Sequence, residues 1–139
     1  MKPHVLFVCN RNSGRSLMAE ALFQHMIGQR AECSSAGTDP AQMPDPTVAA
    51  AMAEIGVSLV SQPKELTSAM TAKADRLIAM GCSPVPDRAT DVWDLPDPAG
   101  KSLEEVRKIR DQIKARLGIL IIDLGVARPA TRRLDSPEQ

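Results

Sequence analysis

The run from His4 to Cys9 is continuously apolar, and it constrains the fold of this chain more than any other segment. A run of this length is typical of a strand that is buried on both faces, as in a parallel sheet. Strand-like and helix-like segments then alternate along the chain. The later strands are expected at 31–37, 74–80 and 91–95, and the helices at 13–29, 46–55, 66–73 and 103–124. This alternation predicts an α/β fold: one domain with a four-stranded parallel sheet flanked by helices, in flavodoxin-like order.

The length of 139 residues also indicates a single domain, which we expect to cover residues 1–125. Residues 126–139 are polar and contain proline, so a flexible tail is expected there. With 17 basic and 17 acidic side chains the formal net charge is zero, which argues against a nucleic acid or a membrane surface as partner. No apolar run is long enough for a transmembrane helix. Three cysteines do not suggest a disulfide framework, so a cytoplasmic location is expected.

The first strand ends at a cysteine, and the pattern C-x5-R-S follows with Cys9, Arg15 and Ser16. In open parallel sheets, ligands bind beyond the carboxyl ends of the strands. A short loop before a helix directs backbone N–H groups and partial positive charge at an anion, and the arginine binds two of its oxygens. The same field favours a cysteine thiolate. This segment, the oxyanion loop (residues 9–15), therefore predicts nucleophilic attack by Cys9 on a tetrahedral oxyanion.

Each residue of the oxyanion loop has an expected role. The backbone N–H groups that hold the oxyanion belong to Asn10, Arg11, Asn12, Ser13, Gly14 and Arg15. The Ser16 hydroxyl can donate to Cys9 Sγ, and Asn12 can adopt the left-handed backbone conformation that holds the loop. Two interpretations stay open for the Arg11 side chain, which either adds positive potential at the mouth of the site or is simply solvated.

The pattern resembles the low-molecular-weight protein tyrosine phosphatase superfamily, which includes thioredoxin-coupled and related arsenate reductases. Further matching segments are Asn12, Ser16-x-Met18-Ala19-Glu20, Ser35-Ala36-Gly37-Thr38 and Asp97-Pro98. Together they extend over nearly the whole chain. The resemblance implies that Asp97 is the general acid that gives a proton to the leaving oxygen.

The number of thiols that the reaction needs distinguishes the phosphatases of this superfamily from its arsenate reductases. Arsenate reduction takes two electrons, so a second thiol must attack the Cys9 adduct. Cys82 is the candidate, because it follows the third strand and neighbouring strand ends lie roughly 5 Å apart. The segment W-D-L-P-D-P-A-G-K also resembles the reductases. The chain has no tyrosine and only 2% aromatic residues, so aromatic walls for a phosphotyrosine ring are not expected.

We therefore favour an arsenate reductase. The alternative is a low-molecular-weight protein tyrosine phosphatase that hydrolyses phosphoesters through a phosphocysteine. A third reading is a non-catalytic oxyanion-binding or redox-sensing module. Phosphate and sulfate are expected to mimic arsenate.

The identity of the second thiol and of its reductant stays open. Thioredoxin-coupled reductases carry a further cysteine shortly after the second, whereas residues 83–88 contain none. Either Cys82 attacks and an external redoxin, thioredoxin or glutaredoxin, reduces the disulfide, or a small thiol such as glutathione or mycothiol attacks instead. No bound cofactor is expected, and no metal, because His4 and His25 lack ligand spacing. Cys33 is interpreted as structural.

Overall fold

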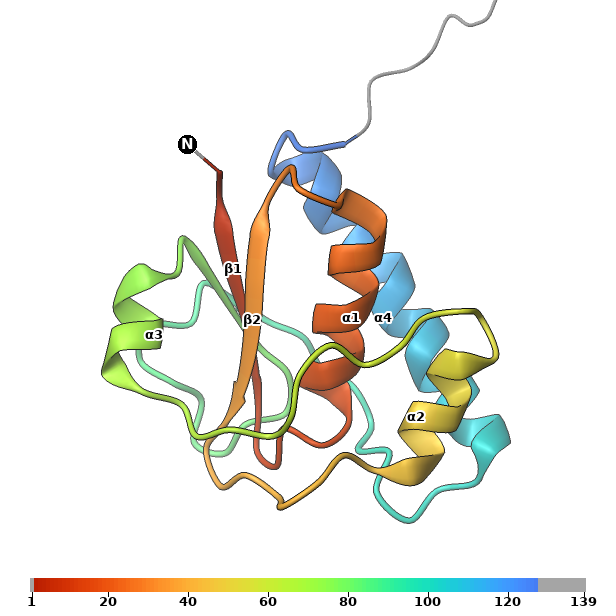
Figure 1. Cartoon of the computed structure of the whole chain (residues 1–139). Coiled ribbons are helices and arrows are strands. Elements are labelled where there is room, and N and C mark those ends of the chain that lie inside the picture. Colours follow the sequence, from red (N-terminus) through yellow and green to blue (C-terminus); the bar gives the residue numbers. More distant parts are fainter. Residues whose placement is uncertain (1, 128–139) are drawn as a thin grey trace, which may run out of the picture.

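Strands and helices alternate along the chain as the sequence predicts. The computed structural model describes residues 2–127 (Figure 1). Its elements are β1 (His4–Cys9), α1 (Arg15–Ile27), β2 (Glu32–Gly37), α2 (Pro46–Ala53), α3 (Ser68–Lys73), β3 (Arg76–Ala79), β4 (Asp91–Val92) and α4 (Leu103–Asp123).

The four strands form one parallel sheet in the order β2-β1-β3-β4. Strand β1 is therefore central, and its Val8 pairs with Ala36 of β2 on one side and with Ala79 of β3 on the other. This confirms the α/β fold in flavodoxin-like order, including the expected neighbourhood of the first and third strands. The carboxyl ends of β1 and β2 lie together at the lower edge in Figure 1, where the connecting loops gather.

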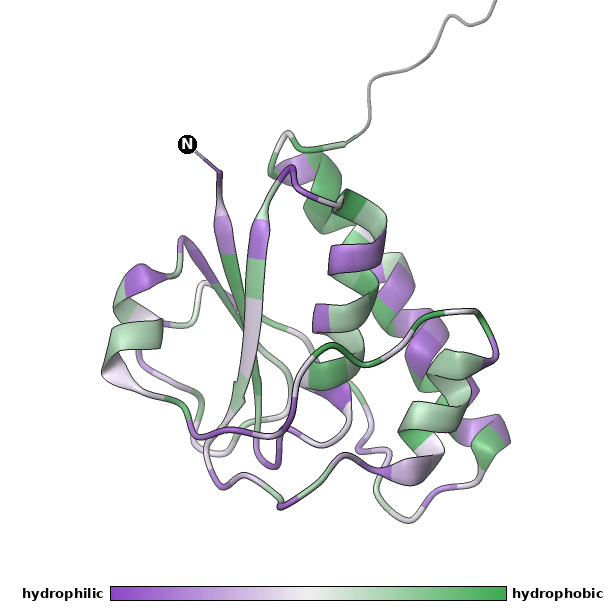
Figure 2. Ribbon diagram, viewed as in Figure 1, coloured by the Kyte–Doolittle hydropathy of each residue, from purple (hydrophilic) through white to green (hydrophobic). Residues whose placement is uncertain are grey.

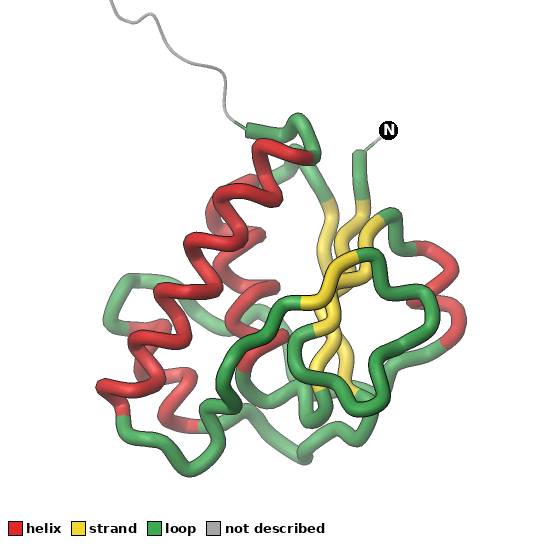
Figure 3. The backbone as a smooth tube through the Cα atoms, turned by 180° about the vertical axis from the view of Figure 1, so that it is seen from behind, coloured by secondary structure: helices red, strands yellow, loops and turns green. Residues whose placement is uncertain are grey.

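Helices cover both faces of the sheet. Helices α1, α2 and α4 lie on one side of it and α3 lies on the other (Figures 1 and 3). Because side chains alternate along a strand, β1 contributes to two cores. Its Val5, Phe7 and Cys9 belong to the larger core, while Leu6 and Val8 belong to a smaller cluster on the α3 side. Figure 2 shows β1 as markedly more hydrophobic than the serine-containing edge strand β2.

Local sequence signals explain where helices begin. Asp45 precedes Pro46 at the start of α2, and its side chain accepts a hydrogen bond from Thr47 N–H at 2.9 Å. Ser102 and Glu105 form a capping box at the start of α4, in which each side chain accepts from the other's backbone N–H.

Several element ends differ from the prediction. Strand β4 covers Asp91–Val92 instead of the expected 91–95: Trp93 N–H still donates to Ala79 O at 2.8 Å, but the carbonyl of Leu95 accepts from Arg15 and takes no part in the sheet. Strand β3 begins at Arg76 instead of residue 74, since Ala74 caps α3. Helix α2 ends at Ala53, shortly before Gly56, whose φ of 75° stops it.

The packed part of the chain reaches Val126, which belongs to the larger core and whose carbonyl accepts a hydrogen bond from Arg30 at 2.7 Å. The remainder of the predicted tail, 128–139, lies outside the described residues. Within residues 2–127, no helix combines the length and the apolar character needed to cross a bilayer.

Candidate active site

The oxyanion loop connects the central strand to the first helix. Cys9 is the last residue of β1, Gly14 is the N-cap of α1, and Arg15 is the first helical residue. The buried strand fixes the position of the cysteine, and the N-terminus of α1 directs partial positive charge at the loop. The loop thus lies at the carboxyl end of β1, the place where the sequence predicts the ligand site.

The segment after β2 (residues 38–45) binds the backbone carbonyl groups of the oxyanion loop. Four hydrogen bonds join them: Thr38 N–H to Cys9 O (3.1 Å), Asp39 N–H to Asn10 O (2.8 Å), Ala41 N–H to Arg11 O (2.8 Å) and Asp45 N–H to Ser13 O (3.0 Å). Within residues 2–127, no backbone carbonyl accepts a hydrogen bond from the N–H groups of 10–15. The loop therefore has these donors available for an anion, and their role in binding an oxyanion stays a prediction.

A chain of side-chain hydrogen bonds leads to the cysteine. Ser16 Oγ lies 2.9 Å from Cys9 Sγ, and Asn12 Nδ2 donates to Ser16 Oγ at 2.6 Å. Because Ser16 accepts from Asn12, its own hydrogen is free to point at the sulfur and stabilise a thiolate. Asn12 is buried and has a φ of 50°, the left-handed conformation that its position requires. Its Oδ1 accepts from Lys64 N–H at 3.0 Å, which ties the loop to the chain after α2.

The Arg15 guanidinium is buried at the edge of the site. Its Nη1 donates to Leu95 O at 3.0 Å, and its Nη2 lies 3.9 Å from Asp97 Oδ2. It also rests against Gly81, where an added Cβ would lie only 2.0 Å from Nη1. The loop after β3 therefore forms one wall of the arginine site, and the absence of a side chain at Gly81 makes room for it.

The predicted acid, Asp97, is exposed at the mouth of the site. Its Oδ1 accepts a hydrogen bond from Ala99 N–H at 3.0 Å, which leaves Oδ2 toward Arg15. The next residue, Pro98, is buried against the oxyanion loop, since a Cβ at Gly14 would lie 2.6 Å from its Cγ. The contact between Gly14 and Pro98 thus joins the oxyanion loop to the segment that carries Asp97.

Cys82 lies beside the oxyanion loop but does not face it. Its thiol donates to Val8 O at 3.1 Å, and its side chain belongs to the smaller cluster, whereas Cys9 belongs to the larger core. Burial raises the pKa of the Cys82 thiol. The prediction that Cys82 follows a neighbouring strand is confirmed, and the structure adds that its thiol donates to the backbone of β1.

An open cleft of about 560 Å³ lies over the oxyanion loop. It is lined by Asn10, Arg11, Thr38, Asp39, Ser83, Pro84 and Asp97. The Arg11 side chain lies at the opening of this cleft, and its Nη1 donates to Asp39 Oδ2 at 2.9 Å, so its charge is paired with a carboxylate.

The three aromatic side chains of the chain, Phe7, Phe23 and Trp93, are all buried in the larger core. Aromatic walls are therefore absent from the cleft, as expected.

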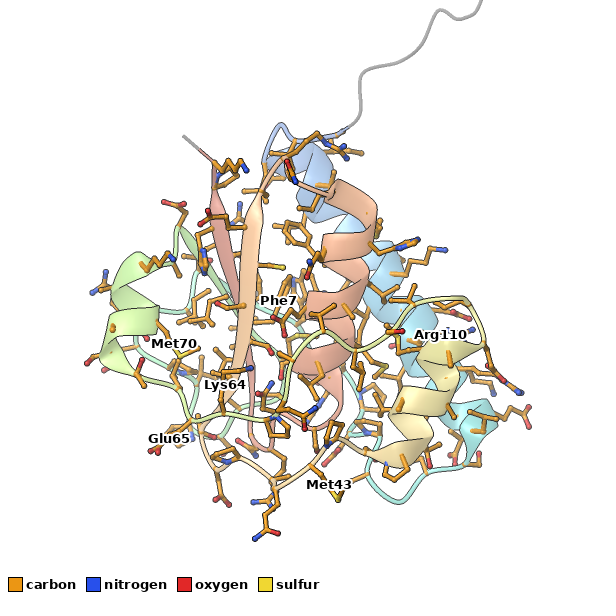
Figure 4. All side chains as sticks on the ribbon, in the orientation of Figure 1. Phe7, Met43, Lys64, Glu65, Met70 and Arg110 are labelled. Carbon is orange, nitrogen blue, oxygen red and sulfur yellow. The ribbon has the colours of Figure 1, made fainter. Side chains whose placement is uncertain are left out.

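Sequence reasoning assigned no role to a buried polar cluster behind the oxyanion loop. Glu20 Oε1 accepts from Ser35 Oγ at 2.6 Å and from Ser61 Oγ at 2.7 Å. Lys64 Nζ donates to Ser61 Oγ at 3.0 Å and to Ser35 O at 3.2 Å, beside the lower end of β2 in Figure 4. Burial lowers the pKa of Lys64, and the charge of Glu20 opposes this shift. The sequence does carry a signal for this cluster: Ser16 and Glu20 are four residues apart, so Glu20 lies on the same face of α1 as Ser16 and close to the oxyanion loop.

Cys33 lies apart from this chemistry. Its thiol is 3.7 Å from Glu20 O, and burial raises its pKa to about 12. A thiol with such a pKa is unreactive at neutral pH, which agrees with a structural interpretation. In the part of the chain that the structure describes, no three His, Cys, Asp or Glu side chains cluster closely enough to hold a metal ion.

Comparison with known proteins identifies the family. Residues 4–83 match the family described as low molecular weight phosphotyrosine protein phosphatase, and this chain belongs to that family. The glutaredoxin arsenate reductase of Synechocystis sp. is 34% identical over 125 residues, covering 84% of this chain and 95% of that protein.

Solved structures give the same result. A thioredoxin-dependent arsenate reductase from Corynebacterium glutamicum superposes with a TM-score of 0.77 at 32% identity, covering 91% of this chain and 64% of that one. An arsenate reductase in the phosphate binding state superposes with a TM-score of 0.80 at 31% identity, covering 89% and 99% of the two chains. The fold and family expected from the sequence are thereby confirmed.

Proposed function

We propose that this chain is an arsenate reductase in which Cys9 forms an adduct with arsenate and a second thiol releases arsenite. The observation that carries the proposal is the Cys82 thiol, which contacts the backbone of Val8 one residue before Cys9. A phosphocysteine mechanism uses one thiol. Reduction of As(V) to As(III) needs two electrons, which two thiols supply by forming a disulfide. The names of the similar proteins support this choice of substrate.

In the first step, the Cys9 thiolate attacks the arsenic atom of arsenate. An S–As bond forms and an As–O bond breaks, and Asp97 gives the leaving oxygen a proton so that it departs as water. The N–H groups of 10–15 and the Arg15 guanidinium bind the remaining oxygens and stabilise the charge of the transition state. Arsenic is still As(V) after this step.

In the second step, the thiolate of Cys82 attacks Cys9 Sγ. An S–S bond forms, the S–As bond breaks, and the electron pair stays on arsenic, which leaves as arsenite. An external dithiol then reduces the disulfide. A redoxin is the preferred donor, because one similar protein is named for glutaredoxin and another for thioredoxin. Attack by a small thiol such as glutathione or mycothiol is the alternative to Cys82. A reducing, cytoplasmic location agrees with this chemistry.

The second candidate is phosphoester hydrolysis through a phosphocysteine. The placement of Asp97 Oδ2 near Arg15 favours it, since an acid above a cysteine and an arginine also serves a phosphate ester. The cleft argues against phosphotyrosine as substrate, because no aromatic side chain lines it.

Arsenite production with arsenate and either the thioredoxin or the glutaredoxin–glutathione system tests the proposal. We expect turnover by the wild type, none by Cys9→Ser, and a loss of at least tenfold in Cys82→Ser when a redoxin is the only reductant. Turnover of an aryl phosphate without arsenite formation would establish the phosphatase instead. Binding of arsenate without turnover of either substrate would indicate an oxyanion-binding module. An unaffected Cys82→Ser variant would assign the second attack to an external thiol.

A further inference from the structure

The loop after β3 touches the oxyanion loop through consecutive residues. Gly81 lies against the Arg15 guanidinium, Cys82 Sγ donates to Val8 O, and Ser83 N–H donates to Asn10 Oδ1 at 3.3 Å. The hydrogen bonds of Cys82 and Ser83 therefore end on β1 or on the residue that follows it. Any movement of Cys82 changes contacts that the oxyanion loop itself makes.

Cys82 must move before it can react with Cys9. In the structure its side chain is only 7% exposed and belongs to the cluster on the α3 side of the sheet, while Cys9 belongs to the core on the other side. Its thiol is occupied as a donor to Val8 O, and burial holds the pKa of that thiol above its ordinary value. A thiol in this position is protected from reaction until its loop opens.

Asn10 links that loop to the site. Its side chain is half-buried at the cleft, and its Oδ1 accepts two hydrogen bonds, from Thr38 Oγ1 at 3.0 Å and from Ser83 N–H. The Thr38 hydroxyl belongs to the segment after β2, so Asn10 Oδ1 accepts from two different segments of the chain. Asn10 also follows Cys9 directly and supplies one of the free backbone N–H groups, so a bound oxyanion and the Cys82 loop act on the same residue.

We propose that Asn10 is a positioning residue for Cys82: its hydrogen bond to Ser83 N–H keeps the Cys82 loop closed until the Cys9 adduct forms. This inference rests on the proposed arsenate reductase function. When the bond opens, Cys82 leaves the cluster, loses its proton to solvent and attacks Cys9 Sγ. The S–S bond then forms as the S–As bond breaks, with the electron pair retained by arsenic. Asn10 thereby controls the second step of the reaction.

Alkylation of Cys82 tests the restraint without any arsenic chemistry. The rate of its reaction with iodoacetamide is read by peptide mass spectrometry in a Cys9→Ser background. Loss of one neutral hydrogen bond predicts that Asn10→Ala raises this rate by about 2- to 10-fold. Asn10→Asp keeps the acceptor and should restore the parental rate. Thr38→Val removes the other donor to the same oxygen and is the matched control, with a change below about twofold expected. Equal rates in Asn10→Ala and Thr38→Val would overturn the proposal.

Two further measurements distinguish release of the Cys82 loop from a general loss of stability of the domain. Alkylation of Cys33 in the same spectra reports general unfolding, and it should stay unchanged in Asn10→Ala. Hydrogen exchange in the unmodified protein needs no variant: the Ser83 amide is expected to be protected, and exchange at the rate of an unstructured amide would contradict the proposal.

The chemical step is then measured with Cys9 present. Arsenate is added at saturation without reductant, and the Cys9–Cys82 disulfide is followed by mass spectrometry. The bridge should form faster in Asn10→Ala than in the wild type. If neither protein forms a bridge while the alkylation rates differ as expected, Cys82 is not the second thiol of the proposed reaction, and only the restraint on its loop stands. If the bridge forms at equal rates in both, the restraint does not control the reaction.

Discussion

The guanidinium of Arg15 lies directly against the α-carbon of Gly81, so closely that a methyl group there would come within 2.0 Å of Nη1. One residue on the loop after β3 thus decides where the principal cation of the site can sit. The same residue has a φ of 86°, which favours glycine independently of the arginine.

Gly81→Ala should therefore impair catalysis far more than folding. Displacement of the guanidinium removes a donor that stabilises transition-state charge, and a fall of about 100-fold in kcat/KM is expected. Gly56→Ala is the matched control, because its φ of 75° imposes a similar backbone strain while nothing lies within 4 Å of the added Cβ. Both variants should lose a similar amount of stability, and only Gly81→Ala should lose activity. Equal activity in the two would show that the contact with Arg15 is unimportant.

Ser16→Ala should slow the reaction of Cys9 with iodoacetamide at pH 7. The hydroxyl lies 2.9 Å from Sγ, and a hydrogen bond to a charged group stabilises it enough to change the rate by about tenfold. Asn12→Ala should act in the same direction, since it frees Ser16 Oγ to turn away. Ser34→Ala is the control, because its hydroxyl bonds to His4 at the other end of β2. A rate unchanged by Ser16→Ala would exclude this hydroxyl as the thiolate partner.

Asp97→Asn should lower the hydrolysis of an aryl phosphate by about 100-fold or more, since a general acid contributes at least that factor. The nearby Asp94→Asn removes the same charge from an exposed position and should leave the rate within about twofold. Steady-state kinetics at pH 6 separates the two. Similar losses in both variants would assign the effect to surface charge.

Replacement of Lys64 should destabilise the domain through Glu20. Lys64→Met leaves a buried carboxylate that keeps its two serine donors but loses its cationic neighbour. The expected loss is about 2 kcal/mol in the free energy of unfolding, measured with urea. The double variant with Glu20→Gln should recover part of it, as coupled partners do. A double variant that is less stable than the sum of both single losses would contradict this pairing.

The Cys33 thiol predicts how stability depends on alkaline pH. Its pKa rises from an ordinary value of 9.0 to about 12 on folding, so the folded state binds the proton more tightly than the unfolded state. This contribution is complete below pH 9 and is lost as pH rises from 9 toward 12. The urea midpoint of the wild type should therefore fall more steeply between pH 8 and 10.5 than that of Cys33→Ala. Parallel curves would show that the thiol is not desolvated in the folded state.

Short-range signals explain why much of the fold could be predicted. The apolar run of β1, the Asp45-Pro46 start of α2 and the Ser102–Glu105 capping box act within a few residues, and the structure contains all three. The end of β4 was predicted wrongly because the carbonyl of Leu95 accepts a hydrogen bond from Arg15, 80 residues earlier in the chain, instead of pairing in the sheet. Where this short edge strand ends therefore depends on a distant residue.

The candidate site, too, has features that depend on local sequence and features that depend on tertiary contacts. The sequence by itself determined the spacing of Cys9, Arg15 and Ser16, because a strand, a short loop and a helix start are local structures that place these groups around one anion. Only the tertiary structure decided that Gly81 makes room for Arg15, that Asn10 accepts from Ser83 N–H, and that the Cys82 thiol donates to Val8 O. These contacts join segments about 70 residues apart, and local chain preferences do not reach over that separation.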